Sequence, residues 1–391
     1  MSCRDEDRFA RVALTWLAEP GTRTVHQLVA EHGAVATLAS LLAGDAPDAR
    51  LRTAVAARTA GTDPRHAAEV ALGRAQRLGV RIAVPADPEW PAQVEDLVRL
   101  DGLAAAGRTD RETRPPLCLW VRGAEPLAAA LARSVAVVGA RAATGYGAHV
   151  AAELGHGLAT RGWTVLSGGA YGVDAAAHRG ALAAGGCTVA VLACGLDRPY
   201  PAGHAALFEA VAESGLVVSE WPPGAEPHRH RFLIRNRVIA AATAGTVLVE
   251  AAARSGATST LRRAAALGRA AMVVPGPVTS AMSVGAHEML RELPGSRLVT
   301  GVAHVLEEVG RIGDDLAPLA RGPRTVRDTL DPDAARLLEA MPARGAIGPE
   351  ELATRAGLDL RTALRRLGLL SELDLVARTA AGYTLRRAGR G

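Results

Sequence analysis

The sequence predicts an α/β protein with a doubly wound parallel sheet, preceded by a small helical domain and followed by a winged-helix domain. Short apolar segments recur through the centre of the chain, and most of the gaps between them hold Ala-rich helical segments. Such alternation is typical of parallel strands joined by crossover helices. Towards both ends of the chain, apolar residues instead recur every three or four positions, which indicates helices.

Residues 1–79 form the predicted N-terminal helical domain. Apolar residues have helical spacing in residues 8–19 and again in residues 24–44. Pro20 and Gly21 interrupt the pattern, and a proline–glycine pair favours a turn between two helices.

The predicted central domain spans residues 80–309. It opens with a short strand and a proline-bounded turn, and residues 101–116 are polar and small, which predicts a loop. Six apolar segments then predict strands, at residues 134–139, 163–169, 187–195, 216–220, 245–250 and 270–276. Several of them lack alternation, as strands buried on both faces do. Each ends in Gly, Ser or Glu, and such sheets bind ligands outside the carboxyl ends of their strands.

The C-terminal part begins with a predicted linker at residues 310–330, where Gly, Pro and mixed charges show no periodicity. Residues 331–391 then contain three helical segments and two short strands around a turn, the order found in a winged helix. Arg361, Arg365 and Arg366 lie on the third helix. They predict either a DNA-recognition face or a protein-contact face, since winged helices serve both purposes.

Composition argues against metal, disulfide and membrane proteins. Cys3, Cys118, Cys187 and Cys194 form no CxxC pair and have no histidine at ligand spacing, so we expect reduced core residues and no metal. The charged N-terminus lacks the apolar run of a signal peptide. No segment approaches the roughly 18 apolar residues of a membrane span. We therefore expect a cytoplasmic protein without membrane contact.

The charge of the chain permits a polyanionic partner. The formal net charge is +5, and the 45 basic residues are all arginines. An arginine can bind a phosphate through two parallel hydrogen bonds and keeps its charge at any physiological pH.

Four segments carry the candidate chemistry, and the first follows the strand at residues 134–139. Glycines from Gly139 to Gly147 would let backbone N–H groups face an anion at the start of a helix. Arg141 lies within this turn, which points to phosphate rather than ribose.

The second segment repeats this design at the end of the strand at residues 163–169. Ser167, Gly168 and Gly169 end the strand, and Asp174 is the predicted N-cap of the next helix. His178 on that helix is interpreted as a histidine that packs against the core.

The third segment is Arg235-Asn236-Arg237, at a predicted boundary between a loop and a helix. With residues 228–231 it forms the densest basic cluster in the chain. Positions i and i+2 diverge on a helix, so both arginines face one way only if the segment is still turning. Otherwise one arginine faces a phosphate and the other is structural.

The fourth segment follows the strand at residues 245–250. Ser255, Gly256 and Thr258 open a helix and offer hydroxyl and amide groups to phosphate. Glu250 closes the strand and either binds a sugar hydroxyl or pairs with an arginine such as Arg235. Several anion sites on adjacent strand ends indicate a track for a polyanion.

Together these segments resemble the DNA-processing protein A family, in unbroken order over about residues 80–309. The matching motifs include SVAVVGARAATGYG, SGGAYGVDAAAHRGAL, FLIRNRVIA and VLVEAAARSGATST. The resemblance implies an extended Rossmann-like domain that binds single-stranded DNA as a homodimer. It further implies recruitment of the RecA recombinase in natural transformation and related recombination, with neither catalytic residues nor a cofactor.

The resemblance also assigns the phosphate contacts, and they lie in all four segments: Gly139, Arg141, Ser167, Gly168, Gly169, Arg235, Asn236, Arg237, Ser255, Gly256 and Thr258. Asp174 and Glu250 are expected to support them. The sequence departs from the family at His204 and His287, where many members have Asn. It also has Cys187 where Lys is frequent, so we expect one DNA contact to be missing.

Two other functions remain open from the sequence. A nucleoside-monophosphate phosphoribohydrolase would share the sheet, and Glu250 loosely echoes its catalytic acid, although the PGGxGT block and a second carboxylate are missing. A nucleotide-sensing regulator would use the winged helix on a specific duplex. Aromatic residues are few, and the candidates for base stacking are Tyr146, Tyr171 and Phe232.

Overall fold

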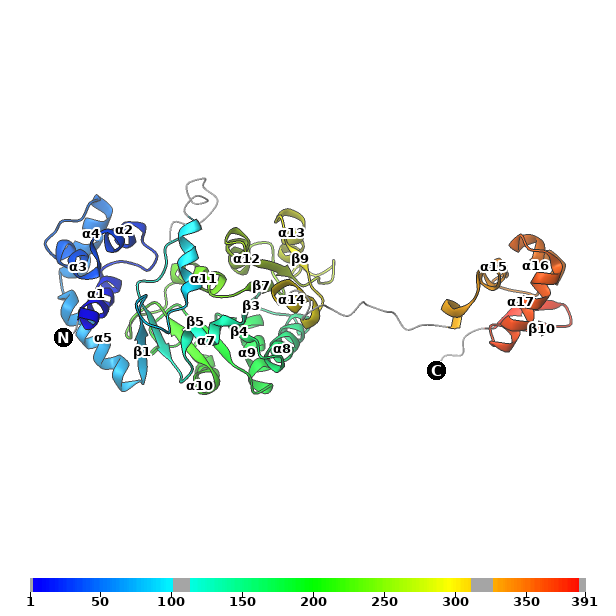
Figure 1. Cartoon of the computed structure of the whole chain (residues 1–391), viewed down its shortest axis with the longest axis horizontal. Coiled ribbons are helices and arrows are strands. Elements are labelled where there is room, and N and C mark those ends of the chain that lie inside the picture. The colour runs from blue at the N-terminus through cyan, green and yellow to red at the C-terminus, as the bar shows by residue number, and fades with distance from the viewer. Residues whose placement is uncertain (1–2, 101–112, 311–325, 387–391) are drawn as a thin grey trace. The chain divides into compact units, whose positions relative to one another are not determined.

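The computed structural model describes residues 3–100, 113–310 and 326–386, and it divides into two compact units, Met1–Ala317 and Pro318–Gly391 (Figure 1). Most of the predicted loop at 101–116 and of the predicted linker at 310–330 lies outside the described residues. In the described parts, no helix is long and apolar enough to cross a membrane.

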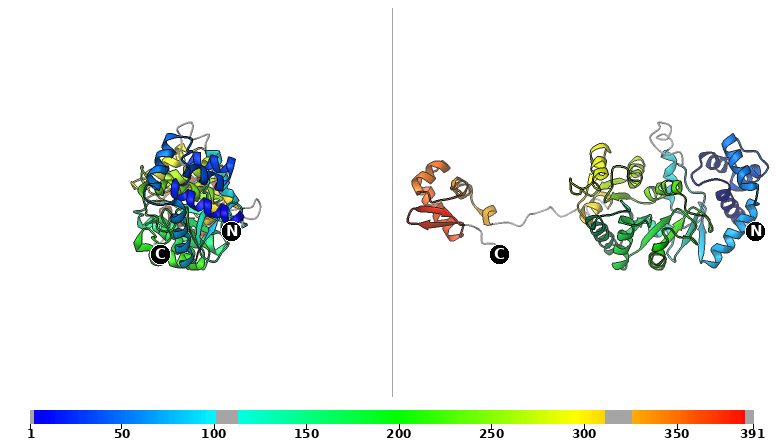
Figure 2. Two further views of the ribbon diagram at one scale, coloured as in Figure 1. Left: turned by 90° about the vertical axis from the view of Figure 1, so that its left-hand side faces the viewer. Right: turned by 180° about the vertical axis from the view of Figure 1, so that it is seen from behind.

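The first unit begins with helices, as predicted: α1 (Cys3–Leu17), α2 (Arg23–His32), α3 (Ala34–Leu42), α4 (Ala49–Thr59) and α5 (Pro64–Arg77). Asp48 caps α4 by accepting a hydrogen bond from the backbone of Leu51, and Asp63 caps α5 ahead of Pro64. Figures 1 and 2 both show these helices (blue) beside the end of the sheet that carries β1.

The N-terminal helices share a hydrophobic core with the sheet. Leu14 and Leu17 of α1 belong to the same buried cluster as Trp120 and Leu192. The structure therefore places helices and sheet in one compact unit, and a domain boundary after residue 79 stays a prediction.

The sheet has nine strands in the order β1-β2-β6-β5-β4-β3-β7-β8-β9. The strands are β1 (Val80–Ala83), β2 (Leu119–Arg122), β3 (Ser134–Val138), β4 (Thr164–Ser167), β5 (Thr188–Leu192), β6 (Leu216–Ser219), β7 (Gly245–Leu248), β8 (Ala270–Val273) and β9 (Arg297–Leu298). Strands β3 to β9 are parallel, which confirms the six central predictions. Strand β1 is the short strand predicted at the start of the domain, and with β2, which was not predicted, it adds an antiparallel edge beside β6.

Helices cover both faces of the sheet, which confirms the doubly wound class. They are α7 (Leu127–Ala132), α8 (Gly145–Thr160), α9 (Val173–Ala183), α10 (Ala205–Ser214), α11 (Arg229–Ala241), α12 (Ala257–Ala266), α13 (Val284–Glu292) and α14 (Val302–Val309), with the short 3₁₀ helices η1 (Ala92–Leu100) and η2 (Ala202–His204). Along β3, Val135 and Val137 join the core on one face, and Ala136 and Val138 join the core on the other. This explains why these strands lack a polar alternation.

The second unit has its own core around Leu337, Leu352 and Leu367. Its elements are η3 (Val326–Thr329), α15 (Pro332–Ala340), α16 (Pro349–Ala356), α17 (Leu360–Glu372), β10 (Val376–Thr379) and β11 (Gly382–Leu385). Three helices and an antiparallel strand pair occur in the predicted order. Their assignment to the winged-helix class stays a prediction.

Candidate nucleic-acid interface

A cleft of about 300 Å³ opens at the carboxyl ends of β3 and β7. From β3 the chain builds the sheet through β4 and β5 towards β6, whereas from β7 it builds the sheet in the opposite direction. The cleft thus lies at the topological switch point, where doubly wound sheets bind ligands. Most of its lining comes from the turn after β3, the helix α11 and the turn after β7, and Ala170, Asp174 and Met282 complete it.

The turn after β3 is held against the sheet by Glu250. The carboxylate accepts hydrogen bonds from the backbone N–H of Thr144 (2.9 Å) and from its hydroxyl (2.6 Å). Thr144 in turn caps α8 by accepting from Gly147. Both Glu250 oxygens bond to Thr144, and Arg235 donates to Gly168 and Val191 instead, so the predicted pairing of Glu250 with Arg235 is wrong. Its binding to a sugar hydroxyl stays a prediction. Its acid serves to fix the turn that carries Gly139.

Arg141 extends from this turn into the cleft. Its guanidinium carbon lies 5.0 Å from the centroid of the Phe232 ring, a cation–π contact that fixes the side chain. Arg141 is exposed, and no carboxylate in residues 3–100, 113–310 or 326–386 forms an ion pair with it. Its charge is therefore directed at the solvent side of the cleft.

Arg235 forms the floor of the cleft. It donates to the carbonyl oxygens of Gly168 (2.8 Å) and Val191, and it is 5% exposed. Burial lowers the pKa of Arg235 to about 10, and the neighbouring Asp174 opposes this shift. The guanidinium therefore remains charged at neutral pH. Asn236 lies beside it and also lines the cleft.

In the second predicted segment, Ser167, Gly168 and Gly169 support Arg235 and do not line the cleft, whereas Asp174 does. The Ser167 hydroxyl is buried and donates to Val137 O at 2.6 Å. The Gly168 carbonyl accepts from Arg235, and the Gly169 carbonyl lies 3.0 Å from Nδ1 of His204. We therefore assign Ser167, Gly168 and Gly169 a bracing role in place of the predicted phosphate contact.

Asp174 and His178 are both buried on α9. The Asp174 carboxylate accepts from the backbone N–H groups of Gly168 (3.1 Å) and Ala170 (3.3 Å), and burial raises its pKa. Gly172 occupies the N-cap position, so the predicted cap at Asp174 is wrong by two residues. His178 packs in the core, as interpreted, with Nδ1 2.7 Å from the Thr188 hydroxyl.

Arg237 is excluded from the cleft. Its side chain is fully buried and forms an ion pair with Glu220 at 2.7 Å. Since α11 already begins at Arg229, residues 235 and 237 lie in a regular helix and diverge. The assignment of Arg237 to a phosphate is therefore wrong, and this arginine is structural.

The turn after β7 supplies the third wall. Ser255 and Gly256 line the cleft, and both accept hydrogen bonds from the first backbone N–H groups of α12, which hold this turn in place. Thr258 does not line the cleft, because its hydroxyl donates back to Ser255 O at 2.7 Å. Arg254 lines the cleft and is exposed, although it was not among the assigned contacts. Its position in the sequence, directly before the assigned residue Ser255, could have identified Arg254 as a candidate contact.

The cleft has an excess of positive charge. Arg141, Arg235 and Arg254 line it, against the single carboxylate of Asp174. Phe232 is the aromatic residue in its lining, and the ring of Tyr200 lies 5.5 Å from the Phe232 ring, centroid to centroid. The described residues contain no cluster of His, Cys, Asp and Glu that could hold a metal ion. The arrangement is suited to binding an anion next to a planar group.

Comparisons with known proteins agree with this architecture. The sequence profile of the DNA recombination-mediator protein A family matches residues 81–310. A Mycobacterium tuberculosis protein provisionally named DNA processing protein DprA is 46% identical over 315 residues, which cover 81% of this chain and 79% of that protein. The Escherichia coli protein Smf is 39% identical over 195 residues, which cover 50% of this chain and 51% of that protein.

A solved structure is similar as well. The X-ray structure of DNA processing protein A from Streptococcus pneumoniae has a TM-score of 0.61 and 27% identity, covering 78% of this chain and 98% of that chain. All residues that line the cleft fall inside the matched range 81–310.

Proposed function

Because this chain belongs to the DNA recombination-mediator protein A family, we propose that its cleft binds the backbone of single-stranded DNA. The observation that carries the proposal is the convergence of Arg141, Arg235 and Arg254, from three separate elements, on one cleft at the switch point of the sheet. Arginine binds phosphate oxygens through charge-assisted hydrogen bonds, which are often bidentate.

The aromatic residues near the cleft support a single strand rather than a duplex. Phe232 contacts the guanidinium of Arg141, and the half-exposed ring of Tyr200 lies beside Phe232. Stacking on such faces tolerates any base sequence, because every base has a π-face. A duplex hides its bases, so this arrangement favours unpaired strands.

We further propose that the chain acts without catalysis, as a homodimer that delivers single-stranded DNA to RecA in the cytoplasm. The family supports the DNA-processing part of this proposal. Within the described residues, Glu250 holds the turn after β3 and is unavailable as the acid of a phosphoribohydrolase. This observation disfavours the enzymatic alternative.

A salt titration tests the proposal. Binding of fluorescent poly-dT should be tight and independent of sequence, and log K should fall with log salt by about 0.7 for each phosphate contacted. Preference for one duplex sequence would instead indicate the regulator, and release of base from nucleoside monophosphates would indicate the enzyme. RecA filament nucleation on strands coated with single-strand-binding protein tests delivery.

A further inference from the structure

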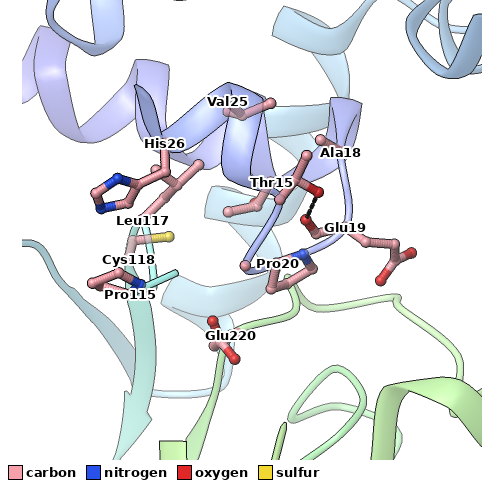
Figure 3. A pocket seen from close by; sticks show the side chains of 12 residues that line it. Thr15, Ala18, Glu19, Pro20, Val25, His26, Pro115, Leu117, Cys118 and Glu220 are labelled. Atoms are coloured by element: carbon pink, nitrogen blue, oxygen red, sulfur yellow. Dashed lines mark hydrogen bonds between the residues drawn. The ribbon is translucent and has the colours of Figure 1, made fainter. Parts of the chain in front are cut away.

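Glu19 joins the N-terminal helices to the cleft helix α11. It follows the end of α1, and Figure 3 shows Glu19 and Pro20 (blue) on one side of a small cavity with Glu220 (green ribbon) on the other. Its carboxylate accepts from Arg231 at 2.6 and 3.1 Å and from the Trp221 indole at 3.0 Å. Arg58 of α4 adds a third donor at 2.9 Å.

The contact with Arg231 fixes the first turn of α11. Arg231 is 8% exposed and comes directly before Phe232. One helical turn later, Arg235 and Asn236 line the cleft. A shift of Arg231 would therefore move the residues that form one wall of the cleft.

A second ion pair holds the same helix further along. Arg237 pairs with Glu220, which lies next to Trp221 in the chain. Two acids thus restrain α11, Glu19 after α1 through Arg231 and Glu220 after β6 through Arg237. Only Glu19 is far from the cleft in sequence.

We propose that Glu19 is a positioning residue for single-stranded DNA binding: it sets the place of α11, so that Phe232, Arg235 and Asn236 meet the strand together. The proposal rests on the proposed function of the cleft. Burial raises the pKa of Glu19, but hydrogen bonds from Arg231 and Trp221 lower it to about 2. The carboxylate is therefore ionised at every pH at which DNA binding would be measured.

A double-mutant cycle separates positioning from simple stabilisation. Glu19→Ala should weaken poly-dT binding about tenfold at a temperature where the variant is fully folded. In a Phe232→Ala background, Glu19→Ala should weaken binding by only about threefold, because one of the three contacts that it displaces is already missing. In an Arg254→Ala background the full loss should persist, because Arg254 lies on the turn after β7 and not on α11.

Two further variants keep the test decisive. Glu19→Gln retains an acceptor for the Trp221 indole, so it should fold even if Glu19→Ala does not. Its affinity for poly-dT should be about threefold lower than that of the wild type. Glu209→Ala removes an exposed acid–arginine pair with Arg122 (2.8 Å) at β2, and its poly-dT affinity should match that of the wild type.

The outcomes distinguish the two proposals. If the wild type does not bind poly-dT, the proposed function fails, and the role of Glu19 fails with it. If the wild type binds poly-dT and both Glu19 variants bind it as tightly as the wild type does, the positioning role alone is overturned. Equal losses in the Phe232→Ala and Arg254→Ala backgrounds would also overturn it, because they would show a general effect on the fold.

Discussion

At the scale of single residues, environment separates side chains that the sequence presents as equivalent. Arg235 and Arg237 belong to one motif, yet the first lines the cleft and the second pairs with Glu220. Residues two apart diverge on a helix, but the sequence did not show that the helix already begins at Arg229. The role of Glu250 was also missed, because its partner Thr144 is 106 positions away in the chain.

Arg141→Ala should weaken binding to every single-stranded sequence alike. The substitution removes one phosphate contact, so the slope of log K against log salt should become shallower by about 0.7. Fluorescence anisotropy with poly-dT and a mixed-sequence strand, at four or more salt concentrations, measures both quantities. An unchanged affinity and slope would remove Arg141 from the interface.

Arg237→Ala should lower the stability of the fold. It leaves the buried Glu220 carboxylate without its partner, and such a loss costs about 3–5 kcal/mol of unfolding free energy. Chemical denaturation measures this cost. Arg122→Ala is the matched control, because it breaks an exposed pair and should cost less than about 1 kcal/mol. Equal costs for the two variants would contradict the burial argument.

Glu19 should make stability depend on pH in the acidic range. The folded protein lowers the pKa of this group from its ordinary 4.5 to about 2. A lowered pKa stabilises the fold above pH 4.5, and that contribution is lost as the pH falls towards 2. The stability difference between the wild type and Glu19→Gln should therefore be largest at neutral pH and shrink below pH 4.5. Thermal denaturation across this range measures it, and a constant difference would refute the assignment.

At the scale of elements, two adjacent helices approach each other through glycine. Gly155 of α8 faces the backbone carbonyl of Ala177, and Gly180 of α9 faces that of Ala152, so that a Cβ at either glycine would overlap the carbonyl. The sequence shows these glycines only as weak helix formers. Glycine is needed at these two positions because the helices lie so close together, and no local sequence pattern shows that distance.

Gly155→Ala should therefore lower stability, although alanine normally favours a helix. Forcing the helices apart costs about 1–3 kcal/mol, which is visible as a drop in melting temperature. Gly145→Ala in the first turn of the same helix is the control, because no atom lies within 4 Å of its added Cβ. If Gly145→Ala were the more damaging change, close packing of α8 on α9 would not be the cause.

At the scale of the whole molecule, the sequence predicted the sheet better than its surroundings. The six central strands are buried on both faces, so their unalternated apolar runs were a strong signal. Strand β1 was predicted, but its antiparallel pairing with β2, and that of β2 with β6, was missed because these pairings join parts of the chain that are distant in sequence. The N-terminal helices were predicted as a separate domain, but their shared core with Trp120 depends on contacts between distant parts of the chain.

The two compact units should unfold separately, because each has its own core. Leu367→Ala removes a fully buried side chain from the second unit, which should cost about 2–5 kcal/mol there. Differential scanning calorimetry should show one transition shifted to lower temperature and the other unchanged. A single transition that shifts as a whole would show that the units are coupled.

The guanidinium groups around the cleft have one more consequence. The chain contains no lysine, so acetyl-transfer enzymes and amine-reactive reagents find no side-chain target on this surface. Neither reversible acylation nor mild alkalinity can switch off the attraction for a nucleic acid, since the most perturbed of these groups still titrates only at about 10. Under the proposed function, we therefore expect competition from another macromolecule or added salt, rather than lysine acetylation, to release the bound strand.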